Sequence, residues 1–198
     1  MMMDTKTIEY YNTNTEAFIS DTFNTDMTNL QDRFLSYLEK GDRILDLGCG
    51  SGRDTKYFIS KGFDVEAIDG SEELCMKAFD ILGVEIRHLY FDELDYQNEF
   101  DGIWACASLL HVNSENLPSI ISRCFKALKK DGVFYLSFKL GDFEGERNDR
   151  YYTDMTEEKM RNLLSSIPES NRIEEILITG DARKDRPEKW LNVFVRKI

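Results

Sequence analysis

The stretch that decides the fold of this 198-residue chain is Ile44-Leu45-Asp46-Leu47-Gly48-Cys49-Gly50-Ser51-Gly52-Arg53. The apolar residues before the first glycine are typical of a buried strand, and a helical pattern begins at the final arginine. Glycines at alternate positions let the backbone turn through positive φ and come close to a ligand. The free N–H groups at the start of the following helix attract negative charge. The stretch therefore predicts a strand, a ligand-binding loop and a helix in direct succession.

From residue 43 onward, short apolar runs alternate with patterns of helical spacing. Predicted strands span residues 43–47, 63–68, 84–89, 100–107, 132–138, 172–179 and 190–196. Predicted helices span residues 28–40, 53–61, 71–82, 115–130 and 156–166. We expect left-handed glycine caps to end helices at Gly41, Gly62, Gly83 and Gly132. We expect the charged stretch from Gly141 to Asp154 to be a loop, and Thr156 to cap the last helix.

This alternation predicts an α/β fold, a doubly wound, mostly parallel seven-stranded sheet that ends in a C-terminal antiparallel hairpin. The sequence contains no internal repeat and no linker rich in Pro, Gly or Ser. We therefore expect one structural unit, with residues 1–41 as an N-terminal helical cover and residues 42–198 as the domain that holds the sheet.

The composition restricts the class of partner. Lys and Arg number 25 against 37 Asp and Glu, a net charge of -12, which disfavours nucleic acid and anionic membranes. The opening residues contain no apolar stretch of signal-peptide length, so we expect a cytoplasmic protein, either a monomer or a homodimer. The four cysteines form no Cys-x-x-Cys pair, so we expect reduced thiols and no metal site.

Asp69 stands 21 residues after Gly48, at the end of the second predicted strand. A carboxylate at this place accepts hydrogen bonds from both hydroxyls of a ribose. A second interpretation is that Asp69 only caps the helix that begins near Ser71. The dinucleotide fingerprint Gly-x-Gly-x-x-Gly requires a third glycine where this chain has Arg53, which argues against NAD or FAD.

The run from Ile44 to Arg53, followed by Asp69, resembles motifs I and II of the class I S-adenosylmethionine-dependent methyltransferases. The resemblance extends over residues 10–198 and includes the terminal hairpin, which distinguishes this Rossmann-like fold from a dinucleotide-binding sheet. It implies S-adenosylmethionine as cofactor. Within the class, the form Gly-Cys-Gly-Ser-Gly-Arg is similar to the small bacterial tellurite-resistance-like methyltransferases.

The resemblance implies which residues hold the cofactor. The first acid and the glycine loop would bind its methionine part, Asp69 its ribose, and the segment after the third strand its adenine. The end of the fourth strand would border the sulfonium, and the N-terminal segment would close over the cofactor. The residues implied are Tyr11, Asp46, Gly48, Cys49, Gly50, Gly52, Arg53, Asp69, Gly70, Phe91, Asp92 and Ala105.

Two segments depart from the family's patterns. The segment Tyr11-Asn12-x-x-Thr15-x-x-Phe18 differs from the pattern Tyr-Asp-x-x-Ala-x-x-Tyr at its last three defined positions. Tyr90 stands where many members have an acid, which leaves the partner of the adenine amino group open.

His111 is the predicted catalytic base, because imidazole titrates near neutral pH and the residue follows the fourth strand. An equally weighted interpretation is that His111 only orients the turn after that strand. Loops at this edge of an α/β sheet commonly carry specificity, so we expect a substrate lid there. The predicted substrate-binding residues are Tyr10, Arg147, Arg150 and Tyr151.

These observations predict an enzyme that transfers a methyl group from S-adenosylmethionine to a small molecule by in-line displacement. Three alternatives stay open. One is methyl transfer to RNA or protein, with Arg183, Lys184 and Arg186 as a small basic patch. Another is a protein that binds the cofactor without turnover. An NAD-dependent oxidoreductase is the least favoured.

Overall fold

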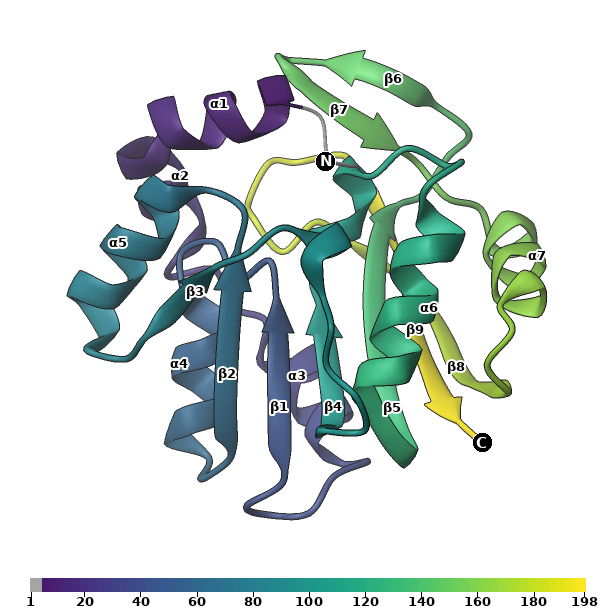
Figure 1. Cartoon of the computed structure of the whole chain (residues 1–198). Coiled ribbons are helices and arrows are strands. Elements are labelled where there is room, and N and C mark those ends of the chain that lie inside the picture. Colours follow the sequence, from purple (N-terminus) through teal and green to yellow (C-terminus); the bar gives the residue numbers. More distant parts are fainter. Residues whose placement is uncertain (1–4) are drawn as a thin grey trace.

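The computed structural model describes residues 5–198, which form a seven-stranded sheet in the order β3-β2-β1-β4-β5-β9-β8 (Figure 1). The strands are β1 (Arg43–Leu47), β2 (Asp64–Asp69), β3 (Ile86–His88), β4 (Phe100–Ala105), β5 (Leu128–Lys139), β8 (Asn171–Gly180) and β9 (Lys189–Lys197). β1 to β5 are parallel to one another, whereas β9 is antiparallel to both β5 and β8. The predicted fold class and terminal hairpin are confirmed.

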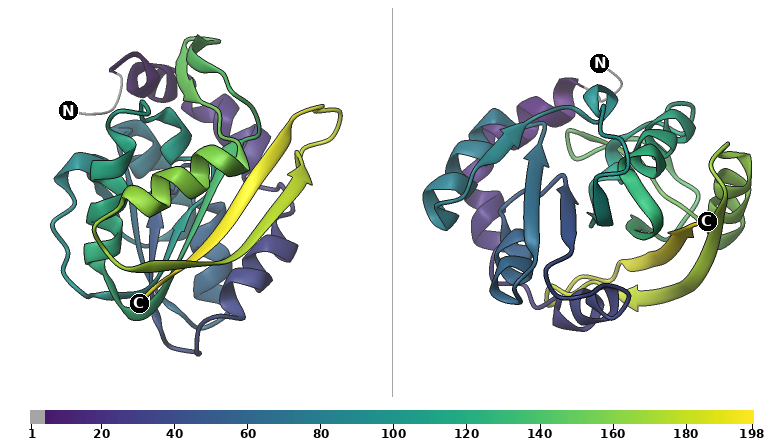
Figure 2. Two further views of the ribbon diagram at one scale, coloured as in Figure 1. Left: turned by 90° about the vertical axis from the view of Figure 1, so that its right-hand side faces the viewer. Right: turned by 60° about the horizontal axis from the view of Figure 1, so that its bottom comes forward.

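Helices cover both faces of the sheet (Figures 1 and 2). They are α1 (Thr5–Thr13), α2 (Thr15–Thr22), α3 (Thr28–Leu35), α4 (Arg53–Ser60), α5 (Glu72–Leu82), α6 (Leu117–Ala127) and α7 (Glu157–Ser166), with 3-10 turns η1 (Phe91–Glu93) and η2 (Leu109–His111). Phe34 of α3 and Phe58 of α4 pack on Trp104 and Tyr135 in one apolar layer. α6 and α7 close the larger layer on the opposite face. Burial on both faces explains why the strands read as continuous apolar runs.

The carboxyl ends of the parallel strands lie at one edge of the sheet, and several further elements cover this edge. α1 and the hairpin of β6 (Glu144–Arg147) and β7 (Arg150–Thr153) lie above it (Figure 1). Lys6 of α1 pairs with Glu146 at 2.8 Å, and Thr7 Oγ1 accepts the backbone N–H of Tyr151 at 2.9 Å. The N-terminal helices and the hairpin are therefore joined over the edge where a doubly wound sheet binds its ligand.

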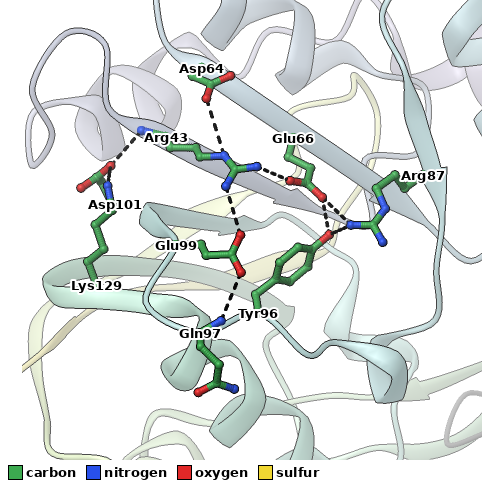
Figure 3. Close-up of polar contacts among 9 residues, drawn as sticks. All are labelled: Arg43, Asp64, Glu66, Arg87, Tyr96, Gln97, Glu99, Asp101 and Lys129. Carbon is green, nitrogen blue, oxygen red and sulfur yellow. Dashed lines mark hydrogen bonds and ion pairs between the residues drawn. The ribbon is translucent and has the colours of Figure 1, made fainter.

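The opposite edge carries a network of charged side chains (Figure 3). Arg43, the first residue of β1, binds Glu66 at 2.6 Å and Glu99 at 3.2 Å. Glu66 also accepts from Arg87 at 2.8 Å, and Lys129 pairs with Asp101 at 2.7 Å. The network ties β1, β2 and β3 to the starts of β4 and β5. Each partly exposed pair contributes at most about 1 kcal/mol to stability.

Several sequence predictions need correction. The α-helix expected over residues 28–40 ends at Leu35 with Ser36 as its cap, so Gly41 does not cap it, and the helix expected over 115–130 ends at Ala127, where β5 begins directly. The charged stretch expected to be a loop contains the β6–β7 hairpin, whose turn residues Asn148 and Asp149 have φ of 52° and 59°. Positive φ at both turn residues is the signature of a tight hairpin.

Gly132 does not cap a helix, contrary to expectation, because Asp131 takes the left-handed conformation instead, with φ of 64°. A Cβ at Gly132 would lie 3.0 Å from the carbonyl oxygens of Asp101 and Lys129. The glycine is therefore needed for close backbone packing. Within residues 5–198, every helix is too short or too polar to cross a membrane.

A substitution at Gly102 in β4 tests how tightly α3 and the residues after it pack on the sheet. A Cβ there would lie 2.7 Å from Phe34 Cζ and 2.9 Å from Leu38 Cδ1, whereas a Cβ at Gly180 would meet nothing within 4 Å. We expect Gly102→Ala to lower the free energy of unfolding by about 1–3 kcal/mol through overpacking. Urea denaturation measures the loss, and Gly180→Ala is the matched control. Equal stability of the two variants would contradict the packing.

Candidate active site

The glycine loop has the positive φ angles that the sequence predicts. Gly48, Gly50 and Gly52 have φ of 78°, 53° and 76°, a region that other residues rarely adopt. A Cβ at Gly48 would lie 2.5 Å from Ser108 Cβ, and one at Gly50 would lie 2.9 Å from the Phe18 ring. The loop backbone therefore lies against η2 and α2 with no room for side chains.

Asp69 ends β2 beside this loop. Its carboxylate accepts the backbone N–H of Gly50 at 2.9 Å and that of Ser71 at 2.8 Å. Ser71, not Asp69, caps α5 through its own hydroxyl, which accepts from Leu74 N. Burial raises the pKa of Asp69 above its usual value, and the two backbone hydrogen bonds oppose the rise. A carboxylate has about four acceptor positions, so this one has about two left for a ligand.

Two further buried carboxylates, Asp46 and Asp54, lie close to the loop and differ in charge. Asp54 accepts from Arg53 at 2.7 Å, from Gln31 at 2.6 Å and from Trp104 at 2.9 Å. Burial alone would raise the pKa of Asp54, but these donors hold it below its usual value. Burial raises the pKa of Asp46 to about 8, and the nearby charge of Asp54 adds to the rise. Asp46 is therefore the neutral member of the pair, hydrogen-bonded to Thr55 Oγ1 at 2.6 Å.

His111 connects three elements. Its Nδ1 lies 2.6 Å from the backbone carbonyl of Tyr151 in β7, and its Nε2 lies 2.8 Å from the hydroxyl of Tyr11 in α1. A carbonyl only accepts, so Nδ1 carries the proton, and in the neutral imidazole Nε2 accepts from the Tyr11 O–H. Burial raises the pKa of Tyr11, so the phenol is a neutral donor. The imidazole is thus held in one tautomer with its basic nitrogen toward Tyr11.

A cavity of about 450 Å³ opens at this edge of the sheet. Its volume lies within the usual range for small-molecule sites. The structure brings many of the predicted residues to its wall: Tyr11, Gly48, Cys49, Gly50, Arg53, Asp69, Gly70, Phe91, His111 and Arg150. The glycine loop and Asp69 thus share one cavity with the Tyr11–His111 pair.

Other predicted residues lie outside the wall of this cavity: Tyr10, Asp46, Gly52, Asp92, Ala105, Arg147 and Tyr151. Several of them support residues that line it. Gly52 is the left-handed cap of α4, and the ring of Tyr10 packs edge-on against Tyr11 at 5.5 Å. Arg147 pairs with Asp154 at 2.7 Å. Their direct roles toward a ligand stay predictions.

The sequence analysis missed the contribution of the terminal hairpin to the cavity. Trp190 is half-buried on the cavity wall, and its Nε1 donates to Asp181 at 3.1 Å. Asn192 and Ser137 also line the wall. The antiparallel direction of β9 was the available signal, because it returns the link after β8 to the edge where β4 and β5 end.

The four cysteines are free thiols, as predicted. Burial raises the pKa of Cys106 to about 12, so this cavity-lining thiol is protonated near neutral pH. Among residues 5–198, no three His, Cys, Asp or Glu side chains are grouped to hold a metal ion.

The sequence of this chain is similar to those of known methyltransferases. Residues 44–132 match the family described as a methyltransferase domain. An uncharacterized methyltransferase of Staphylococcus carnosus is 24% identical over 143 residues, which cover 67% of this chain and 69% of the relative. A ubiquinone biosynthesis O-methyltransferase of Dechloromonas aromatica is 34% identical over 104 residues, which cover 49% of this chain and 44% of that enzyme.

A solved structure extends the similarity to nearly the whole chain. The 1,6-didemethyltoxoflavin-N1-methyltransferase of Burkholderia thailandensis, with 1,6-didemethyltoxoflavin and S-adenosylhomocysteine bound, is similar with a TM-score of 0.74. The two are 24% identical, and the match covers 96% of this chain and 90% of that one. Residues 44–132 are a methyltransferase domain, and the chain has the fold of the class I S-adenosylmethionine-dependent methyltransferases.

S-adenosylhomocysteine is bound in the Burkholderia thailandensis structure, and S-adenosylmethionine is bound in the magnesium protoporphyrin IX methyltransferase of Synechocystis PCC 6803, which is similar with a TM-score of 0.73. The methyltransferase spans less than half the length of the Dechloromonas aromatica enzyme, so the acceptor of that enzyme is not carried over. The narrower similarity to tellurite-resistance-like methyltransferases stays a prediction.

The buried Asp46 predicts an unusual pH dependence of stability. Its pKa rises from 3.8 to about 8 on folding, so the folded state keeps a proton that the unfolded state loses above pH 4. Stability attributable to this site therefore falls as pH rises from about 4 to 8, by at most about 1.4 kcal/mol per pH unit. We expect Asp46→Asn to be nearly neutral at pH 4 and to stabilise the methyltransferase increasingly toward pH 8.

Urea denaturation of the cofactor-free protein at several pH values measures this gain. Asp80→Asn removes an exposed carboxylate and controls for the change in net charge. A gain from Asp46→Asn that does not grow with pH would contradict the assignment of a neutral Asp46.

Proposed function

We propose that this methyltransferase transfers the methyl group to a small-molecule acceptor bound in the cavity beside the cofactor. One observation carries the proposal: the glycine loop, Asp69 and the Tyr11–His111 pair line a single cavity. Tyr11 and Phe18 from the N-terminal helices and Arg150 and Tyr152 from β7 contribute to its wall. A cavity built from both sides of the sheet edge suits a small acceptor better than a polymer.

The residues of the cavity fit S-adenosylmethionine. Asp69 has about two unused acceptor positions, which match two ribose hydroxyls. Ser108 Oγ is buried against the glycine loop and has no hydrogen-bond partner among the described residues, so it is available to a polar group of the ligand. We assign the methionine and ribose parts to Gly48, Cys49, Gly50, Asp69 and Gly70, and the adenine to Phe91, as the sequence predicts.

In this proposal Arg53 and Asp46 support the cofactor site, whereas the sequence analysis gave them direct contacts with the cofactor. Arg53 already forms a two-point ion pair with Asp54, so it would share its charge with a cofactor carboxylate. Asp46 is hydrogen-bonded to Thr55 and lies behind the loop, where it supports the start of α4. Both would act on the cofactor through the conformation of the loop.

S-adenosylmethionine supplies a methyl group that is already activated by its sulfonium. The protein therefore has to align the acceptor and exclude water, and positioning alone can lower a barrier by about 7–11 kcal/mol. α1 and the β6–β7 hairpin, joined by Lys6–Glu146 and Thr7–Tyr151, keep the reaction edge covered.

An acceptor that must lose a proton needs a base at this edge. Both nitrogens of His111 are engaged, with Tyr151 and Tyr11. We therefore propose that the proton passes from the acceptor to the Tyr11 oxygen while the Tyr11 proton moves to His111 Nε2. Such acid–base assistance commonly contributes a factor of about 10² to 10⁴.

The remaining expectations belong to the same proposal. Residues 1–41 act as the N-terminal cover and residues 42–198 as the catalytic domain, in a monomer or homodimer. Four free cysteines fit the reducing cytoplasm. Arg183 and Arg186 both contact Asp21, at 3.1 and 3.3 Å, so the basic patch considered for RNA is largely neutralised.

Asp69 provides the test of the cofactor site. We expect Asp69→Ala to weaken S-adenosylhomocysteine binding at least tenfold, because each charge-assisted hydrogen bond contributes about 1.5–3 kcal/mol. Isothermal titration measures the affinity. Asp69→Asn keeps the size of the side chain but leaves one acceptor oxygen for the Gly50 and Ser71 N–H groups, so it should also weaken binding, whereas Asp64→Ala changes an acid at the opposite end of β2 and should not. No binding by the unaltered protein would refute the proposal.

The Tyr11–His111 relay predicts non-additive kinetics. We expect Tyr11→Phe and His111→Gln each to lower kcat by about 100-fold, and the double variant to lose little more, because the two residues act as one unit. Tyr57→Phe, which removes an exposed hydroxyl on α4, should keep full activity. Losses that multiply in the double variant would contradict the relay, and binding without any turnover would favour a non-catalytic role.

A further inference from the structure

Arg150 differs from every other cation on the cavity wall. The Lys and Arg residues that line it are Arg53, Lys139, Arg150, Arg183 and Arg186. The other four each have a carboxylate partner, at distances between 2.7 and 3.3 Å. Arg150 has no carboxylate partner among residues 5–198; its guanidinium interacts with the Tyr11 hydroxyl, and its Nε makes a long contact of 3.5 Å to the carbonyl of Asn148.

The position of Arg150 is fixed although its charge is not neutralised. It begins β7 directly after the tight turn at Asn148 and Asp149, whose positive φ values set the direction of the strand. Its guanidinium carbon lies 4.3, 5.8 and 5.4 Å from the ring centres of Tyr10, Tyr11 and Tyr152. Three aromatic rings hold the guanidinium in place while its N–H groups keep their capacity to donate.

The acids on the cavity wall do not neutralise the charge of Arg150. Asp54, Asp181 and Glu188 are each paired with another cation of the wall. Asp69 accepts from the backbone N–H groups of Gly50 and Ser71, and Asp26 accepts from the backbone N–H of Thr28. A half-buried guanidinium with several unused donors is suited to an anionic ligand, because its planar fork matches a carboxylate.

We propose that the acceptor of this methyltransferase is a small carboxylate, and that Arg150 binds its carboxylate group. The inference rests on the proposed function, since it names the class of acceptor for the same site. A single unneutralised cation matches one negative charge, which favours a carboxylate over a doubly charged phosphate. Arg150 also lies beside Tyr11, so a carboxylate held there places the rest of the acceptor near the Tyr11–His111 pair.

The test separates acceptors by charge. A bacterial small-molecule extract is divided on an anion-exchange resin into a retained, anionic fraction and a flow-through fraction. Each is incubated with the full-length protein and S-adenosylmethionine, and S-adenosylhomocysteine formation is measured. We expect turnover with the retained fraction, and loss of that turnover after the carboxylates of the fraction are converted to amides.

Variants then locate the carboxylate site. We expect Arg150→Gln to lower kcat/KM on the retained fraction by about tenfold to a hundredfold, and Arg150→Lys to lower it less, because the charge is kept. S-adenosylhomocysteine affinity should be unchanged in both variants. Arg161→Gln, which removes an exposed arginine of α7, is the control.

The outcomes distinguish this inference from the proposed function. Turnover with the flow-through fraction alone, or survival of turnover after amide formation, overturns the carboxylate while leaving the methyltransferase reaction intact. An unaffected Arg150→Gln variant, or one that loses S-adenosylhomocysteine affinity, overturns the role of Arg150. No turnover with either fraction refutes the small-molecule acceptor itself, and the carboxylate with it.

Discussion

The hydrogen bond from the Gly50 N–H to the Asp69 carboxylate is the contact on which the cofactor end of the site depends. It joins the loop after β1 to the end of β2, and the same carboxylate also accepts from Ser71 at the start of α5. Two strand ends and a helix start are thereby held around one buried charge. The glycines are required because no side chain fits between this loop, Ser108 and Phe18.

The geometry of the glycine loop and Asp69 could be predicted because its determinants are local. A strand, three alternating glycines and an acid at the end of the next strand specify their own geometry, since parallel neighbours end at the same edge. The acceptor end could not be assembled in this way. Tyr11 and His111 are 100 residues apart, and their contact depends on where α1 rests on the folded sheet. Secondary-structure propensity does not predict which residues come together over such a separation in sequence.

The β6–β7 hairpin shows a second limit of prediction from the sequence. Its strands are short and rich in charge, with Glu144, Glu146, Arg147 and Arg150 among eight residues of strand, so they lack the apolar alternation that marks a strand. The hairpin is stabilised instead by its tight turn and by contacts with α1 and η2. The one local signal was the Asn148-Asp149 pair, a dipeptide that tolerates positive φ.

The charge network around Arg43 and Glu66 lies at the edge opposite to the cavity. β1 is five residues long, so its two ends are about 15 Å apart, beyond the range over which substitutions usually interact. Substitutions at the two edges should therefore combine additively. Substitutions in the charge network can change the thermal stability of the protein, and substitutions at the cavity can change the acceptor. The two kinds of adaptation can therefore proceed independently in this chain.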